Sequence, residues 1–164
     1  MFTTSTHLQG LAAQQQRIVG VLDGLDDATM HRPVLPSGWT CAGMLQHLTG
    51  MTSFWFDIVM SGDEFVAVED DFAVPAGTTG TELVERYTQT TTRGHDRVRQ
   101  FPLDTPPAWW PDGLFGPWRL HSLFEVLQHV LVETATHAGH LDAARELIDG
   151  RTWEYSLGRL SDPA

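Results

Sequence analysis

A single long helical pattern occupies residues 122–150 and constrains the fold more than any other stretch of the chain. Ser122 and Glu125 have the spacing of a capping box, and Gly150 stands where helices commonly end. Between these ends, apolar residues recur at steps of three and four, which is typical of a helix that buries one face. Other elements must therefore cover this face. Its clearest apolar members are Val126, Val130, Ala144 and Ile148.

The same face carries four groups that can ligate a metal: His129, Glu133, His137 and His140. Their spacing of three and four residues places them in one row along the helix. Burying such groups without partners is costly. An imidazole and a carboxylate at positions i and i+4, completed by an imidazole from a neighbouring helix, can bind a divalent ion and leave positions open for water or substrate. The row therefore predicts half of a metal site.

His47 is the candidate ligand from a second helix, which we expect to run from a cap at Thr40 to about residue 60. Its neighbours on the same face include Met44 and the two glycines Gly43 and Gly50, so the imidazole is expected to point toward the core. The glycines weaken the helix but let another backbone or a ligand come close. A hydrogen-bonded core histidine is the alternative interpretation of His47 taken alone.

Two further helices are predicted, from residue 5 or 6 to residue 22 or 23 and from about residue 81 to residue 100, with a short helical turn near residues 25–31. Residues 61–80 form a long acidic loop that suggests a crossover or a flap, and residues 102–117 form a loop rich in Pro and Trp. No stretch alternates convincingly enough to predict a strand.

These elements predict an all-α fold, a four-helix bundle with long loops after the second and third helices. We expect one domain over residues 1–164, with a core at about residues 5–150. In the tail at residues 151–164, Trp153 and Tyr155 are expected to dock on the bundle before the chain frays.

The balance of charge argues against nucleic-acid binding. The 164 residues carry a formal net charge of −11, and all 10 basic residues are arginines. A protein that binds a phosphate backbone needs a basic stripe. The nearest approach to one is Arg93, Arg97 and Arg99, which we expect to form a solvated edge of the third helix.

Other features of the sequence favour a cytoplasmic protein. Cys41 is the single cysteine, so no internal disulfide can form, and we expect a small buried core residue. The N-terminal residues lack the pattern of a signal peptide, and no apolar run reaches the roughly 18 residues of a membrane span. The remaining histidines are expected at surfaces or helix ends: His7, His31, His95 and His121.

Two stretches resemble the DinB-like proteins, in particular a branch related to the mycothiol-dependent maleylpyruvate isomerases. They are HVLVETATHAGHLDAARELIDG in the helix at residues 122–150 and SGWTCAGMLQHLTGMTSFWF around His47. The similarity extends over most of residues 5–150. It implies an up-down-down-up four-helix bundle with a divalent metal held near one end by His47, Glu133 and His137. His140 matches a histidine of the narrower branch and would be a further ligand or a group just behind the ligands.

Some DinB-like proteins are thiol-dependent transferases or isomerases, in which the metal lowers the pKa of a small thiol and presents the thiolate to an electrophile. The resemblance therefore implies a metal-dependent, mycothiol-type S-transferase, with zinc as the first choice and nickel, iron or manganese as alternatives. His140 is the candidate base, and His129 is expected to tune a ligand.

The expected partners are a small-molecule thiol and an electrophilic substrate, without nucleic acid or membrane, and base rates favour a homodimer. Two other functions fit the same residues. One is a non-catalytic, metal-stabilised module for binding or dimerisation, and the other is a metal-dependent hydrolase.

Overall fold

The computed structural model describes residues 3–163. Each long helix begins directly after a residue with a hydroxyl side chain. The side chains of Thr3, Thr40, Thr79 and Ser122 accept hydrogen bonds from first-turn N–H groups that a helix leaves unpaired. Glu82 accepts in return from the N–H of Thr79, which completes a capping box. The long helices are α1 (Thr4–Leu22), α3 (Cys41–Ser53), α4 (Gly80–Val98) and α5 (Leu123–Asp149).

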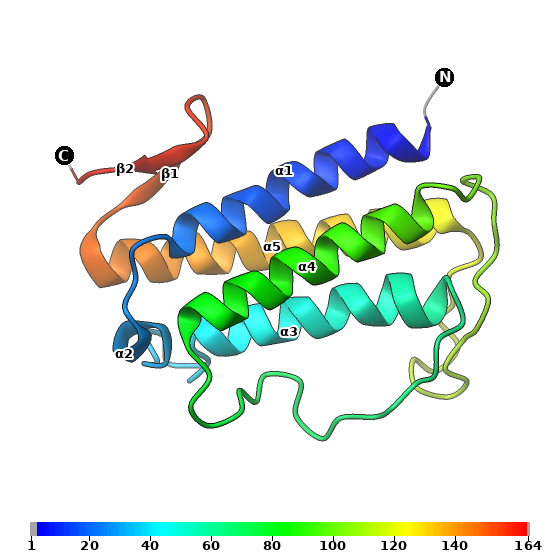
Figure 1. Cartoon of the computed structure of the whole chain (residues 1–164), viewed down its shortest axis with the longest axis horizontal. Coiled ribbons are helices and arrows are strands. Elements are labelled where there is room, and N and C mark those ends of the chain that lie inside the picture. The colour runs from blue at the N-terminus through cyan, green and yellow to red at the C-terminus, as the bar shows by residue number, and fades with distance from the viewer. Residues whose placement is uncertain (1–2, 164) are drawn as a thin grey trace.

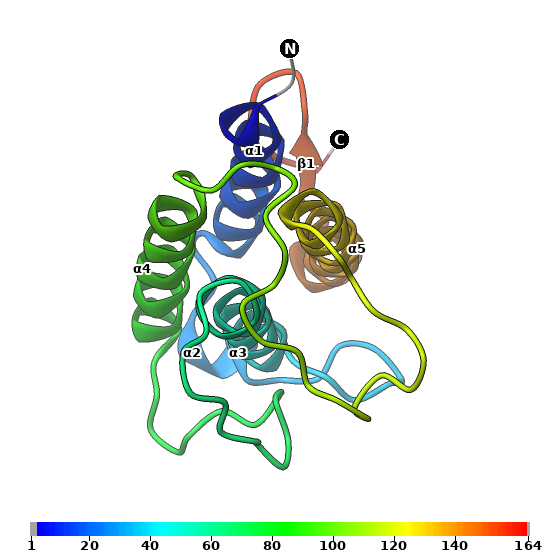
Figure 2. The same ribbon diagram turned by 90° about the vertical axis from the view of Figure 1, so that its right-hand side faces the viewer.

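The four long helices lie side by side (Figure 1). Helices α1 and α5 run in one direction along the molecule, and α3 and α4 run in the other. An end-on view shows α1 above α3, with α4 and α5 on opposite sides (Figure 2). Helix α1 packs mainly on α5 and α3 mainly on α4, while α3 also contacts α5. The contact between α3 and α5 matters most for function, because it joins the helix of His47 to the helix of the acid and histidine row.

The predicted all-α class is confirmed. Helices α1, α3, α4 and α5 account for most of the secondary structure, and a short helix, α2 (Asp27–Met30), follows α1. The predicted helix at residues 122–150 is also confirmed, because α5 covers Leu123–Asp149 and Gly150 follows it in the left-handed conformation, with a φ of 77°. None of the helices within residues 3–163 is long and apolar enough to cross a membrane.

The core lies between these helices and includes the single cysteine. Cys41 is 1% exposed at the start of α3, as the sequence predicted. Burial raises the pKa of its thiol to about 11, so this thiol stays protonated at neutral pH. Other wholly buried core residues are Ile18, Leu45, Leu48, Phe56, Val98, Val126, Val130 and Leu141.

The second long helix reaches residue 59, close to the expected end at about residue 60, but its last part is not α-helical. A π-helical segment, η1 (Phe54–Val59), follows α3, and within it Asp57 is buried. Arg93 and Arg97 of α4 bind the Asp57 carboxylate at 2.7 and 3.1 Å. Burial alone would raise the pKa of Asp57, but the hydrogen bonds from Arg93, Ser53 and Arg97 together hold it below its ordinary value. Arg93 and Arg97 are 51% and 36% exposed, so they lie at a solvated edge as predicted, but the sequence did not show that they also bind a buried carboxylate.

His95 lies in the last turn of α4, near a helix end as expected, but it does not lie at the surface. It is only 9% exposed and packs edge-on against Phe56 of η1. Desolvation, with a smaller contribution from the nearby Arg99, lowers its pKa. His31 and His121 are exposed, as predicted.

The tail forms a hairpin where fraying was expected. Strands β1 (Thr152–Glu154) and β2 (Arg159–Ser161) pair in antiparallel register. The indole of Trp153 covers Gly20 of α1, where any Cβ would collide with the ring. Tyr155 is exposed but lies under the guanidinium of Arg17, 4.7 Å from the ring centroid. Both aromatic side chains thus contact α1, and pairing between the strands fixes the segment around them.

Candidate metal centre

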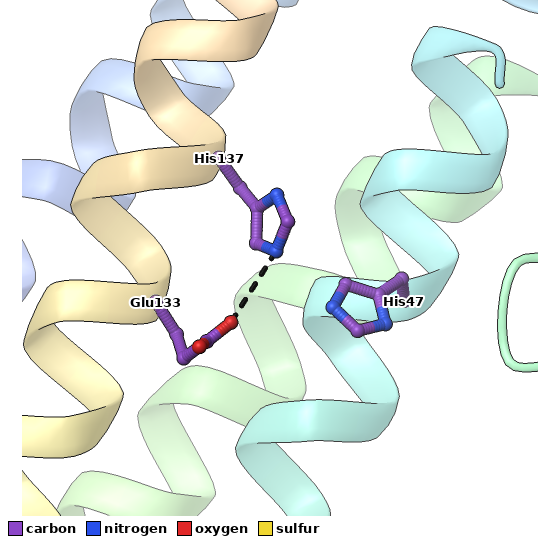
Figure 3. A group of neighbouring side chains, drawn as sticks. All are labelled: His47, Glu133 and His137. Atoms are coloured by element: carbon purple, nitrogen blue, oxygen red, sulfur yellow. Dashed lines mark ion pairs between the residues drawn. The ribbon is translucent and has the colours of Figure 1, made fainter. Parts of the chain in front are cut away.

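His47 of α3 and Glu133 and His137 of α5 face one another across the contact between the two helices (Figure 3). One ligand atom from each residue lies within 4.8 Å of the others. Nε2 of His137 is 3.4 Å from Oε2 of Glu133, and the rings of His47 and His137 are nearly perpendicular with centroids 4.9 Å apart. The structure therefore brings together the three residues that the resemblance implied.

Hydrogen bonds behind the two imidazoles leave the same nitrogen of each ring free to face the cluster. Nδ1 of His47 lies 2.7 Å from Oδ2 of Asp71, and Nδ1 of His137 lies 3.2 Å from Nδ1 of His140. Figure 3 shows the other ring nitrogen of His47 turned toward Glu133 and His137. A neutral imidazole that donates through Nδ1 presents an unprotonated Nε2. Both histidines can therefore offer Nε2 to a common point.

The donor set fits a divalent ion. Tetrahedral bonds of about 2.1 Å to zinc place the ligand atoms about 3.4 Å apart, so the separations within 4.8 Å need to shorten by at most about 1.4 Å, which small side-chain rotations can supply. Two imidazole nitrogens and a carboxylate are typical of zinc and related ions with an open position. Burial first, and then the neighbouring His47, lower the pKa of His137, which favours the neutral form that a metal requires.

His140 lies beside this cluster but outside it. It is exposed, one helical turn beyond His137, and its ring also approaches the indole of Trp39 with centroids 6.0 Å apart. When Nε2 of His137 faces the cluster, the proton on Nδ1 of His137 is donated to His140. This contact places His140 behind a ligand.

His129 stands one turn before Glu133 and belongs to an aromatic wall. Its ring meets Trp55 of η1 edge-on at 4.7 Å between centroids and lies 5.1 Å from Trp118. Desolvation lowers the pKa of His129 although the charge of Glu133 opposes this. His129 lies outside the cluster of three candidate ligands, and its expected role in tuning a ligand stays a prediction.

The connection between α4 and α5, residues 99–122, contains the Pro- and Trp-rich loop at residues 102–117 and supplies the rest of the wall. Phe115 stacks on Trp55 with centroids 5.9 Å apart, and it meets Trp118 edge-on at 5.4 Å. Trp55 is buried, but Trp118 is 41% exposed. An apolar surface that is partly open to solvent therefore adjoins the turn of α5 that precedes Glu133.

Sequence reasoning missed Asp71 and Phe72. Besides the bond from Asp71, the ring of Phe72 stacks on the imidazole of His47 at 4.3 Å, with only 4° between the planes. The carbonyl oxygen of Phe72 lies so close to Gly43 that a Cβ there would be 2.9 Å from it. The close approach of another backbone at this glycine, as predicted, is thus confirmed. The acidic loop and Gly43 were the available signals, but they could not show which acid reaches the histidine.

A hollow elsewhere in the molecule does not involve these residues. It has a volume of about 1050 Å³ and lies between α1, α4 and the C-terminal hairpin. Tyr87 and His95 line it, but the hydroxyl of Tyr87 and Nε2 of His95 are closed to solvent. The chemistry that the histidines offer is therefore concentrated at the contact between α3 and α5.

A match to a known family covers the part of the chain that contains this cluster. The family model described as mycothiol-S-transferase matches residues 7–150, which include α3, α5 and all the residues of the cluster. No curated protein and no solved structure gives a significant match to the chain.

Proposed function

The chain belongs to the mycothiol-S-transferase family, and on this premise we propose that it is a divalent-metal-dependent enzyme that joins the sulfur of a mycothiol-type thiol to a small electrophile. His47, Glu133 and His137 would hold the metal, with zinc as the first choice. The observation that carries the proposal is the convergence of these three ligand atoms within 4.8 Å. Outer hydrogen bonds to Asp71 and His140 support it.

In the proposed reaction, the residues of the chain would bind the metal, accept a proton and contact the electrophile. A metal bound by the cluster would lower the pKa of a thiol at its open side, so that thiolate is present at neutral pH. His140, which is exposed beside His137, is the proposed acceptor of the thiol proton, and to accept it the Nδ1 of His140 must leave its hydrogen bond with His137. The sulfur forms a bond to the electrophilic carbon as the bond from this carbon to the leaving group breaks, and the leaving group departs with the electron pair. Trp118 and His129 offer an apolar wall for the electrophile.

The proposal includes the finer architecture implied by the resemblance, an up-down-down-up four-helix bundle in one domain. The directions of α1, α3, α4 and α5 in Figure 1 support this order. A homodimer stays a prediction, which sedimentation of the purified protein would test.

Metal content is the first test. Protein purified without a histidine tag should contain about one divalent ion per chain, and His47→Ala and His137→Ala should lose it. His121→Ala is the matched control, because His121 is exposed at the start of α5 and outside the cluster. The site would be refuted if wild type held no metal after purification and after addition of zinc. Equal metal occupancy in all three variants would also refute it.

Transfer activity is the second test. The metal-loaded protein is mixed with mycothiol and a chlorinated aromatic compound or an epoxide, and thioether formation is followed by mass spectrometry. The proposal predicts a thioether product that disappears in Glu133→Ala. Tight metal binding without thioether across a panel of thiols and electrophiles would favour the binding-module alternative. Hydrolysed substrate without thioether would favour the hydrolase.

The role of His140 can be separated from that of the ligands. If His140 accepts the thiol proton, His140→Gln lowers kcat by about 100-fold or more while zinc remains bound. If it only orients His137, zinc affinity falls by about 10- to 100-fold and the loaded variant keeps its kcat. The second result would remove His140 from the proton transfer.

A further inference from the structure

The loop that joins η1 to α4 is attached to the metal cluster at one ligand. Two consecutive residues of this loop contact His47 in different ways. Asp71 meets Nδ1 of His47 at 2.7 Å, and Phe72 covers one face of the same imidazole at 4.3 Å between centroids. The main chain of Phe72 also rests against Gly43, one turn before His47. Because the edge and one face of the ring are both occupied, its orientation is set by the loop as well as by α3.

The loop presents this pair from a braced turn. The backbone N–H of Phe72 donates to Oδ1 of Asp70 at 2.9 Å, a short-range bond that fixes the chain between them. Nearer its start, the loop is bound to α4 through two hydrogen bonds from Arg97 to the carboxylate of Asp63. The contact with His47 is therefore one of several attachments that hold an otherwise irregular segment on the helices.

We infer that Asp71 and Phe72 are positioning residues of the metal site, which hold the His47 imidazole with its Nδ1–H on the carboxylate and its Nε2 toward Glu133 and His137. This inference rests on the metal site of the proposed function. A carboxylate behind a ligating imidazole fixes its tautomer and raises its basicity, and loss of such a partner commonly lowers metal affinity about 10- to 100-fold. The stacked ring of Phe72 restricts rotation of the imidazole about its χ2 bond.

The same contacts couple the loop to the metal. If the loop strengthens metal binding through His47, then metal binding must strengthen the attachment of the loop by the same free energy. The acidic loop at residues 61–79 is thereby part of the site and lies over the α3 side of it. If Asp71, which is half-exposed, formed only a surface ion pair with His47, its removal would have little effect on folding or on metal binding.

Zinc affinity tests the first half of the inference. Competition with a chromophoric chelator should show that Asp71→Ala binds zinc about 10- to 100-fold more weakly than wild type. Asp71→Asn should recover part of the loss, because its amide oxygen can still accept from Nδ1. Glu69→Ala is the matched control, since it removes an exposed acid from the same loop and should leave the affinity unchanged. Equal affinities for Asp71→Ala and Glu69→Ala would overturn the inference.

The tautomer of His47 tests the second half without any metal. Nitrogen-15 NMR of the metal-free protein, above the ordinary pKa of histidine, should show the proton of His47 on Nδ1 in wild type and in Glu69→Ala. In Asp71→Ala this preference should be lost, and in Phe72→Ala it should persist while zinc affinity falls. An unchanged tautomer in Asp71→Ala would refute the positioning role.

These outcomes are distinct from failure of the proposed function. A protein that binds zinc in an Asp71-dependent way but transfers no thiol would refute the transferase and leave the positioning role intact. Hydrogen exchange of residues 61–79 with and without zinc adds a direct readout of the coupling. Slower exchange is expected with zinc in wild type, with a smaller effect in Asp71→Ala.

Discussion

Replacement of Arg145 by methionine should be among the most destabilising single changes in this protein. Arg145 is 2% exposed on α5, and its Nη1 donates to the carbonyl oxygens of Val21 at 2.8 Å and Asp23 at 2.7 Å, at the end of α1. Its Nε and Nη2 bind the carboxylate of Asp149 at 3.1 and 2.8 Å. Methionine preserves much of the side-chain volume but leaves the two carbonyls without these donors.

The size of the effect follows from these contacts. Hydrogen bonds from a charged donor contribute about 1.5–3 kcal/mol each, and loss of one partner of a buried ion pair costs about 3–5 kcal/mol. Asp149 is 33% exposed and can be hydrated once the arginine is gone, so its share is smaller. We expect Arg145→Met to lower the free energy of unfolding by about 3–5 kcal/mol. In a chain of this length, that lowers Tm by about 6–20 °C.

Urea unfolding of the metal-free protein, followed by circular dichroism, measures this difference. The matched control is Arg151→Met, because Arg151 is 41% exposed and its contacts to Asp149 and Asp162 are surface ion pairs. The control should cost less than about 1 kcal/mol. If Arg145→Met unfolds within 1 kcal/mol of wild type, or if the two variants are equally destabilised, the assignment of Arg145 as a link between α1 and α5 is wrong.

Three other predictions concern packing, pH and metal. Gly94→Ala should lower the free energy of unfolding by up to about 2 kcal/mol, because its Cβ would lie 2.8 Å from the buried ring of Phe56. In the same urea assay, Gly10→Ala should raise the free energy of unfolding by about 0.5–1 kcal/mol, because a Cβ at Gly10 meets no atom within 4 Å. Because burial lowers the pKa of His95 in the folded state, its contribution to stability is present above the unfolded-state pKa and is lost as pH falls through and below that value. His95→Gln should therefore show a shallower loss of stability on acidification, and an identical pH profile would contradict this. Zinc at 100 times its Kd should raise the free energy of unfolding by about 2.7 kcal/mol. This gain should appear as a higher Tm in wild type but not in His47→Ala. Equal Tm shifts in both proteins would exclude His47 as a ligand.

Local signals in the sequence predicted the helices well. Thr40 and Ser122 mark helix starts because a capping hydroxyl acts within the turn that follows it. The sequence also predicted that the second long helix reaches about residue 60, but it did not show that Phe54–Val59 would be π-helical. This segment contains Asp57, whose ion pairs come from α4. A distant arginine that binds a carboxylate leaves no trace in the local periodicity.

The candidate site was predictable to a similar extent. The row on α5 is visible because residues three and four apart share a helical face. The inward position expected for His47 on the second helix made it the candidate partner, and the resemblance then implied the same residue. The roles of Asp71 and Phe72 were not predictable, because the acidic loop offers several carboxylates and has no periodicity that would place one of them on a histidine.

The sequence by itself therefore determined the helical class, the ends of the long helices and the face on which Glu133 and His137 lie, since each depends on interactions within a few turns of chain. Only the tertiary structure decided which groups meet across helices. It placed His47 opposite the α5 row, Asp71 behind His47, and Arg145 on the carbonyls at the end of α1. The row at residues 129–140 first suggested a metal. Packing of α3 on α5 brings His47 to only two members of this row, Glu133 and His137, and no local pattern in the sequence encodes that packing.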